Sequence, residues 1–411
     1  MWSHLLDRFL RALVQKGSLA VTYPDGTCRN YGDGSGSAVG LRLHDETIVR
    51  QMLLKPELAA GEGYMEGRLT LDGDDLHGFL SLVKTMGKGS RPPRLLRAIK
   101  RLRKLLKRVA QHNPAARSRR NVAHHYDLSG ALYDLFLDED RQYSCAYYAR
   151  PDMTLEEAQA AKKAHIAAKL LTRPGMRVLD IGCGWGGMGL MLAGQHGAEV
   201  TGVTLSEEQH KMANARAKKA GLADRARFEL TDYRDVEGQF DRIVSVGMFE
   251  HVGVPHYHSY FEKIRELLSE DGVAVIHTIG RSAPPSSTNP WIAKYIFPGG
   301  YVPALSEVAP VIEREGLMIT DLEVWRLHYA DTLRHWLGRF DANIDKARAL
   351  YDEKFCRMWR FYLVASEMSF RDGHHVVFQF QLTKRHGVVP VTRDYLCGED
   401  VGAGNGNRTR N

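Results

Sequence analysis

The sequence has no long apolar run, few cysteines and no closely spaced pair of them. No stretch approaches the ~18 apolar residues of a membrane-spanning helix, and charges interrupt the N-terminal MWSHLLDRFLRALV, so we expect no signal peptide. The five cysteines are Cys28, Cys145, Cys183, Cys356 and Cys397. Because none forms a C-x-x-C motif, they favour a reducing compartment and argue against structural zinc. Paired histidines lack a third ligand at a known spacing, so we expect no metal.

Acidic residues are absent between Asp75 and Asp127. This interval contains RPPRLLRAIKRLRKLLKRVAQ, in which apolar residues recur at helical spacing among Arg and Lys. Such a basic amphipathic helix is typical of proteins that bind an anionic membrane surface. A helix packed on its own domain and a nucleic-acid-binding patch are the alternatives. Prolines at both ends also mark the segment as a linker.

The most informative stretch is RVLDIGCGWGG at residues 177–187. An apolar, β-branched run ends at Asp180 and alternating glycines follow, as when a buried parallel strand turns tightly into a helix. Gly182, Gly184 and Gly186 let the backbone approach a ligand that a Cβ atom would exclude. No Lys-Ser/Thr follows to form a phosphate-binding loop. The acid before the glycines favours the S-adenosylmethionine (SAM) turn of a class I methyltransferase over a ligand-free turn or a dinucleotide site.

Four further strands are expected to complete a doubly wound, Rossmann-like α/β sheet, at 198–205, 226–233, 240–247 and 272–279. Ser206 and Gln209 are predicted to form a capping box that begins a helix, which Gly221 ends. Ligands bind at the carboxyl ends of parallel strands, so the site is expected there. Thr204 stands where many nucleotide-binding sheets have an acid for the ribose, so Thr204, Gln209 or the backbone must replace it.

Titratable groups lie at two of these strand ends. Glu250 and His251 follow the strand at 240–247, and His277 lies near the end of the strand at 272–279. A lone strand histidine is usually structural, but titratable groups at adjacent strand ends favour a catalytic role. Residues 121–148 are rich in aromatic and hydroxyl side chains and precede the cofactor turn, so we expect them to form a lid.

Seven segments together resemble the cyclopropane-fatty-acyl-phospholipid synthases, in the order and spacing of that family. They are GEGYMEG (61–67), YSCAYY (143–148), LDIGCGWGG (179–187), GVTLSEEQ (202–209), VGMFEHVG (246–253), HTIG (277–280) and HYADTLRHW (328–336). Each segment alone is a modest signal, whereas the set is specific and covers the chain except its C-terminal tail.

The resemblance implies a reaction and a site for it. In that family, SAM methylates the cis double bond of an acyl chain esterified in a membrane phospholipid, and the resulting carbocation loses a proton and closes to a cyclopropane. A bound bicarbonate would accept the proton, held by side chains of Glu250, His277 and Tyr329 and by backbone at Cys145 and Ile279. A buried Glu250 beside an anion requires a proton or hydrogen bonds that offset the repulsion.

The resemblance also implies which residues bind SAM. They are Tyr143, Ser144, Asp180, Gly182, Gly184, Thr204, Leu205, Gln209, Asp232 and Tyr233. Tyr143 and Ser144 would close over the methionine end, while Asp232 and Tyr233 would lie near the adenine. Cys356 matches a family cysteine regarded as an active-site candidate. Since the reaction needs no covalent nucleophile, we expect Cys356 to be a small core residue.

The chain is expected to divide into four segments. Residues 1–90 would form a smaller N-terminal α+β domain that binds lipid, with a turn at 24–26, and 91–120 the basic amphipathic linker. Residues 121–396 would form the SAM-dependent catalytic domain, and 397–411 a disordered tail. Within the catalytic domain, Trp291, Tyr295, Ile296 and Phe297 are expected to line an acyl channel. The enzyme would act on phospholipid acyl chains in the cytoplasm, bound peripherally to the inner face of the membrane, with a homodimer left open.

Two other classes of protein share part of this pattern. A nucleic-acid methyltransferase would share the fold and suit the net charge of +7. However, the sequence after the strand at 240–247 is Gly-Met-Phe-Glu rather than the Asn/Asp-Pro-Pro-aromatic motif of amino-methylating enzymes, so no nucleic acid is expected. A lipid-binding protein without activity would not need Asp180, Glu250 and His277 at three strand ends. Among lipid enzymes, a methylene-branched or hydroxylated product from the same cation stays open.

Overall fold

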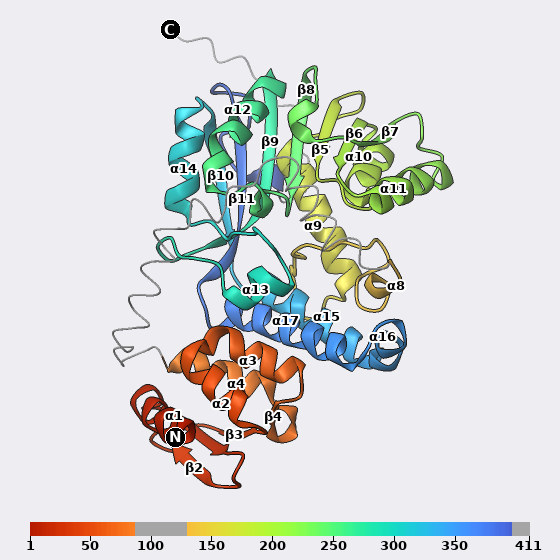
Figure 1. Ribbon diagram of the computed structural model, residues 1–411. Coiled ribbons are helices and arrows are strands. Elements are labelled where there is room, and N and C mark those ends of the chain that lie inside the picture. The colour runs from red at the N-terminus through yellow and green to blue at the C-terminus, as the bar shows by residue number, and fades with distance from the viewer. Residues whose placement is uncertain (87–129, 397–411) are drawn as a thin grey trace.

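The computed structural model describes residues 1–86 and 130–396 (Figure 1). The predicted basic linker at 91–120, the beginning of the predicted lid and the predicted tail at 397–411 lie outside the described residues. None of the helices within the described ranges is both long and apolar enough to cross a membrane.

The N-terminal residues form a small α+β unit around a four-stranded sheet in the order β2-β1-β3-β4. Its elements are α1 (Trp2–Leu13), β1 (Ser18–Thr22), β2 (Cys28–Tyr31), β3 (Ala38–Leu43), α2 (Glu46–Leu54), α3 (Pro56–Met65), β4 (Leu69–Leu71) and α4 (Leu76–Thr85). The predicted turn at 24–26 joins the antiparallel strands β1 and β2, and Gly26 adopts a φ of 82° there.

A seven-stranded sheet in the order β10-β11-β9-β8-β5-β6-β7 forms the larger unit. Its strands are β5 (Arg177–Ile181), β6 (Glu199–Thr204), β7 (Ala226–Leu230), β8 (Phe240–Val246), β9 (Leu268–Arg281), β10 (Met318–Trp325) and β11 (His375–Thr383). The predicted Rossmann-like architecture is confirmed. β10 and β11 are not among the strands predicted from the sequence; β11 inserts between β9 and β10 and pairs antiparallel with both.

Helices cover both faces of this sheet (Figure 1). They are α9 (Leu155–Leu170), α10 (Gly187–His196), α11 (Glu207–Lys219), α12 (Tyr257–Leu267) and α14 (Leu305–Arg314). Successive strand residues point to opposite faces. Val178 therefore packs in one core with Ile166 of α9, whereas the next residue, Leu179, packs in another with Phe261 of α12.

The predicted start of α11 is half correct. Ser206 Oγ accepts a hydrogen bond from the Gln209 N–H at 3.3 Å, as expected of an N-cap. The Gln209 side chain does not complete the capping box, because its Oε1 instead accepts from Thr204 Oγ1 at 2.8 Å. The predicted stop is confirmed, since α11 ends at Lys219 and Gly221 has a φ of 68°.

Helices joined to the last strands connect the two units. They are α13 (Pro290–Tyr295), α15 (His328–Ala342), α16 (Ile344–Leu350) and α17 (Glu353–Arg371); the short α8 (Gly130–Tyr133) precedes α9. Figure 1 shows α17 between the N-terminal helices α3 and α4 and the large sheet. Trp291 of α13 fills this joint, edge-on to Phe361 with ring centroids 4.7 Å apart. A Cβ atom at Gly61 of α3 would lie 2.4 Å from Trp291 Cδ1, so only glycine fits there.

Candidate active site

The large sheet reverses its strand order between β5 and β8, which places a crevice at the carboxyl ends of these two strands. After β5, Gly182, Gly184 and Gly186 have φ values of 78°, 55° and 81°, a region that favours glycine. The N–H groups of Gly182 and Cys183 donate to the carbonyl of Val203 on β6, which fixes the turn. A Cβ atom at Gly184 would meet no atom within 4 Å. The turn therefore leaves room for a ligand against its backbone.

One cavity lies at this crevice, and all ten residues predicted to bind SAM line it. The cavity wall also contains residues that the sequence analysis did not assign to SAM, including Arg141, Gln142, Trp185, Arg234, Met248 and His251. Gln142, Trp185 and Arg234 each adjoin a predicted residue, and spacing alone could not separate neighbours that face the cavity from those that face away. Whether the ten residues contact SAM stays a prediction.

Asp180 is the acid at the base of the cavity. It is the penultimate residue of β5, with only 2% of its surface exposed, and burial raises the pKa of its carboxyl group to about 7. Within the described residues, its Oδ2 atom has no hydrogen-bond partner. A buried carboxylate oxygen without a partner is costly, so this site suits a ligand that donates a hydrogen bond.

Glu250 lies just behind the cavity, in the short 3-10 helix Phe249–His251 that follows β8. Its Oε1 accepts a hydrogen bond from the Ile279 N–H of β9 at 2.6 Å. Burial raises the pKa of Glu250 to about 7, and Oε2 has no partner among the described residues. The Ile279 N–H therefore holds Glu250 in place. That the backbone of Ile279 also faces a bound anion stays a prediction.

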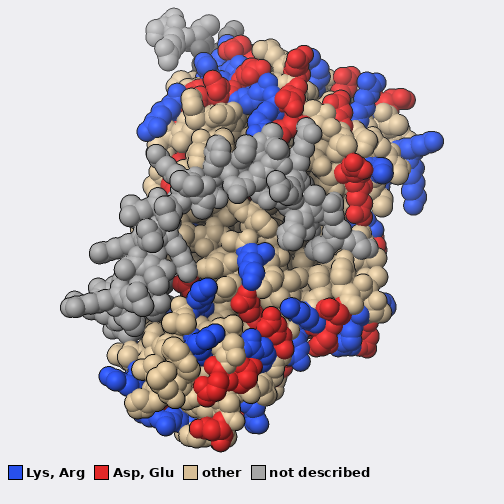
Figure 2. Space-filling view, in the orientation of Figure 1, with Lys and Arg blue, Asp and Glu red and all other residues tan. Residues whose placement is uncertain are grey.

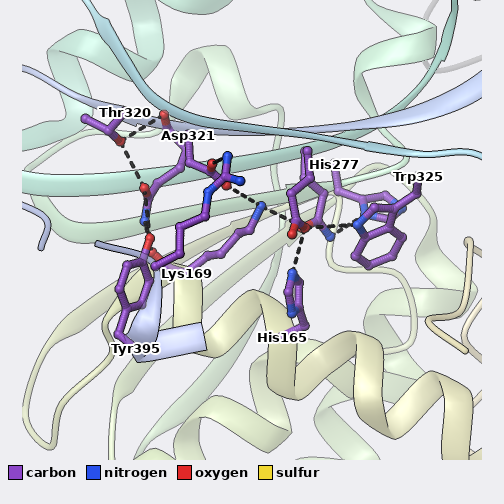
Figure 3. Close-up of polar contacts among 11 residues, drawn as sticks. His165, Lys169, His277, Thr320, Asp321, Trp325 and Tyr395 are labelled. Atoms are coloured by element: carbon purple, nitrogen blue, oxygen red, sulfur yellow. Dashed lines mark hydrogen bonds and ion pairs between the residues drawn. The ribbon is translucent and has the colours of Figure 1, made fainter. Parts of the chain in front are cut away.

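His277 lies on β9 two residues before Ile279, so the two side chains share a face of the sheet. Figure 3 shows its ring beside Trp325, and the ring centroids lie 5.2 Å apart. Gln379 of β11 donates from Nε2 to His277 Nδ1 at 2.9 Å. Burial holds the pKa of His277 well below its usual range, so the ring is neutral. With Nδ1 accepting, Nε2 carries the hydrogen and is the ring's donor.

Tyr329 begins α15 and belongs to an aromatic cluster of Tyr143, Phe297, Tyr329, Trp336 and Tyr362. Tyr143 stacks on Trp336 at 5.2 Å and shares a 2.8 Å hydrogen bond with Tyr362, while Trp336 meets Tyr329 edge-on at 5.8 Å. The ring centroid of Phe297 lies 5.9 Å from that of Tyr362 and 6.0 Å from that of His251. Because Tyr143 and His251 line the cavity, the aromatic cluster adjoins it.

The four residues expected to line an acyl channel occupy different places in the structure. Phe297 adjoins the cavity, but Trp291 and Ile296 are buried in the core, with Trp291 at the joint between the two units. The Tyr295 hydroxyl donates to Glu62 of α3 at 2.7 Å, across the same joint. The expectation was therefore wrong for Trp291, because its ring fills the space opposite Gly61.

The two cysteines named from the resemblance occupy different places. Cys145 is fully buried next to Ala146, whose N–H donates to Thr332 of α15 at 3.0 Å. Burial raises the pKa of the Cys145 thiol, so it is no nucleophile. Cys356 lies on α17 and is 2% exposed within the hydrophobic core. Burial raises the pKa of this thiol as well, as expected of a small core residue.

The fold and the cavity at the strand reversal define a class I SAM-dependent methyltransferase. The model of the mycolic acid cyclopropane synthetase family matches residues 113–380, and a domain family of unknown function matches residues 5–86. The chain belongs to the mycolic acid cyclopropane synthetase family and is an enzyme.

Two curated relatives and one solved structure illustrate the similarity. The cyclopropane-fatty-acyl-phospholipid synthase of Escherichia coli K12 is 38% identical over 82% of this chain and 86% of its own length. The tuberculostearic acid methyltransferase UfaA1 of Mycobacterium tuberculosis is 35% identical over 92% and 91%. The structure of mycolic acid cyclopropane synthase CmaA1 complexed with SAH and CTAB is 35% identical, covers 66% of this chain and 98% of its own, and has a TM-score of 0.62.

Proposed function

We propose that this enzyme transfers a methylene group from SAM to the cis double bond of acyl chains in membrane phospholipids and forms cyclopropane fatty acids. The proposal rests first on family membership and on the name of the E. coli relative. The observation that carries the proposal is the position of Glu250. Its buried carboxyl group lies behind the cofactor cavity and is hydrogen-bonded to Ile279 of β9, two residues after His277.

SAM fits the cavity. The open space at Gly184 accepts a ligand against the backbone, and the unpartnered oxygen of Asp180 accepts a hydrogen bond from it. When bound, SAM supplies the electrophilic methyl group. The protein contributes a water-poor enclosure, since the aromatic cluster adjoins the cavity and three of its five members are buried. Aromatic faces stabilise cations, so this enclosure suits an acceptor carbon that becomes a carbocation.

A proton acceptor is required, because methyl transfer to an alkene leaves a cation with no acceptor of its own. We propose that bicarbonate supplies this acceptor, held by Glu250, His277 and Tyr329 and by backbone at Cys145 and Ile279. The unpartnered Glu250 oxygen and the Nε2–H of neutral His277 supply polar groups for such an ion. A carboxyl group with a pKa near 7 is often protonated at neutral pH, so Glu250 can donate rather than repel.

The charge of the chain supports a membrane-bound substrate. Residues 87–129 hold 13 of the 56 Lys and Arg residues but only one of the 49 Asp and Glu residues, so the rest of the chain is net negative. On the face in Figure 2, both signs of charge intermingle over the described residues without a broad basic patch. We therefore assign docking on anionic phospholipid at the inner face of the membrane to the basic segment.

A second product is favoured by another relative. UfaA1 is named a tuberculostearic acid methyltransferase and covers this chain at similar identity. When a different proton leaves, the same cation gives a methylene branch or a methyl branch beside a chain double bond. A saturated methyl branch would need a further reduction. Mass spectrometry of lipids from cells that express this chain tests the proposal, because rings and branches fragment differently. Ring-containing acyl chains are expected, and branched chains without rings would replace the proposal by the second product.

A further inference from the structure

Lys162 is a buried lysine directly beneath the loop that lines the cofactor cavity. It lies on α9 with 1% of its surface exposed. Its Nζ donates to Ser144 Oγ at 2.8 Å and to Gln142 Oε1 at 2.7 Å. Both acceptor residues line the cavity, whereas Lys162 does not. Lys162 is therefore linked to a bound ligand by hydrogen bonds through these two side chains, and by charge through the cavity residue Asp180.

A side chain from the neighbouring turn of α9 is hydrogen-bonded to the backbone of the same loop. Gln159 Nε2 donates to the carbonyls of Ser144 at 2.9 Å and Gln142 at 3.2 Å. The loop position is thus secured by Gln159, independently of the charge on Lys162. Because Gln159 already holds the loop backbone, the ammonium group of Lys162 is not needed for that purpose. Its distinct contribution is the hydrogen bond to the Ser144 hydroxyl.

Lys162 differs from the second buried lysine of the same helix. Lys169, two turns later, has Nζ 2.9 Å from Asp321 and 3.0 Å from Glu323, and Figure 3 shows it reaching toward Asp321. The hydrogen bonds of Lys162 reach only neutral acceptors. A buried cation that bonds neutral groups is an expensive arrangement for stability alone, so it points to a functional role.

The chemistry of an ammonium group sets the direction of the Ser144 hydroxyl. An ammonium donates only, so Ser144 Oγ must accept from Lys162, and the hydroxyl hydrogen is left for another acceptor. A neutral amine could accept that hydrogen itself. We infer that Lys162 is a positioning residue whose ammonium keeps the Ser144 hydroxyl a hydrogen-bond donor toward the carboxylate at the methionine end of SAM. The inference rests on the proposed SAM binding.

Several charged or titratable groups face Lys162. They are Asp138, Asp140 and Cys145 from the loop, Lys163 from α9, Asp180 from β5 and His277 from β9. Burial is the largest influence and lowers the pKa of Lys162 to about 8. A ligand that needs the ammonium form raises that pKa on binding, so its affinity must fall as the pH rises through about 8. Asp180 has a pKa of about 7, so its titration changes the affinity on the acidic side of pH 8.

Calorimetric titration with S-adenosylhomocysteine (SAH) below and above pH 8 tests the inference. For the wild type we expect the affinity to fall on the alkaline side. Lys162→Met should weaken binding about tenfold at neutral pH, the value of one good hydrogen bond, and remove most of this alkaline fall. Lys169→Met is the matched control. It removes another buried ammonium from α9 and should keep the alkaline fall even if it lowers stability.

Ser144→Ala keeps the inference testable if Lys162→Met does not fold. This variant should also lose the alkaline fall, and combining the two substitutions should cost no more affinity than the larger single effect. An alkaline fall that persists unchanged in both single variants would come from the amino group of the ligand and would overturn the inference. A wild type that binds no SAH would instead overturn the proposed function.

Discussion

The carboxylate of Glu250, on the loop after β8, accepts a hydrogen bond from the backbone N–H of Ile279 on β9 at 2.6 Å. This contact ties two neighbouring strand ends together, and the second oxygen of Glu250 has no hydrogen-bond partner among the described residues. His277 lies on the same face of β9 as Ile279. Glu250 itself does not line the cofactor cavity, whereas His251, the next residue in sequence, does.

Substitution of Glu250 should affect turnover and not cofactor affinity. We expect Glu250→Gln, His277→Ala and Tyr329→Phe each to slow cyclopropanation by roughly 10²-fold or more, because each alters the groups around the proton acceptor. SAH affinity, measured in parallel by calorimetry, should change little. Glu262→Gln on the exposed surface of α12 is the control. Near-normal turnover of all three variants would show that the proton acceptor is bound elsewhere.

Asp180 should make the apo protein less stable as the pH rises. Burial raises its pKa to about 7 from an ordinary value of 3.8, so folding favours the protonated form. This contribution is present below pH 4 and is lost as the pH rises through 7. The free energy of unfolding of Asp180→Asn, taken relative to the wild type, should therefore be higher at pH 8 than at pH 5. The expected difference is on the order of a few kcal/mol. Urea unfolding at both pH values measures this difference, and equal differences would contradict it.

A side chain at Gly184 should block the cofactor without disrupting the fold. Gly184→Val places a branched side chain in open space that faces the cavity, so we expect SAH affinity to be lost. Gly175→Val is a matched control, because Gly175 also has a positive φ, of 77°, and open space around it but does not line the cavity. Both variants carry a similar backbone strain of about 1–2 kcal/mol. Equal SAH binding by the two variants would refute the placement of SAM.

Docking on anionic vesicles should depend on the basic segment at 94–109. Reversal of Arg97, Arg101 and Lys104 to Glu should weaken binding to anionic vesicles, and salt should weaken wild-type binding, because charges are screened over a Debye length of ~8 Å at 0.15 M. SAH affinity should be retained. Reversal of three exposed basic residues elsewhere, Lys218, Lys219 and Arg225, is the control. Salt-independent binding that survives the first reversal would favour a helix packed on its own domain.

The sequence was most informative where the signal is local. The acid and glycines after β5 predict the turn, and the end of each parallel strand predicts a cavity wall, because these features depend on a few consecutive residues. Long-range relationships gave no such signal. The antiparallel insertion of β11 and the bond from Gln379 to His277 depend on which strands become neighbours.

Buried polar residues on helices were the other omission. Lys162 and Lys169 lie in a run rich in Ala and Lys that looks like an ordinary solvated helix, and only the packing of α9 on the sheet makes both of them buried. Trp291 was assigned to a channel because it lies among aromatic and proline residues. Its actual partner, Gly61, is more than two hundred residues away in the sequence.

In the proposed reaction, a methyl group transferred to an alkene loses a proton and closes to a ring. SAM with a fully deuterated methyl group, supplied to the purified enzyme on vesicles of cis-unsaturated anionic phospholipid, tests this reaction when the acyl chains are then examined by mass spectrometry. We expect a cyclopropane whose bridging carbon has lost one of the three deuterons of the methyl group. A product that retains all three deuterons as an intact methyl branch, or no product on these vesicles, would contradict it.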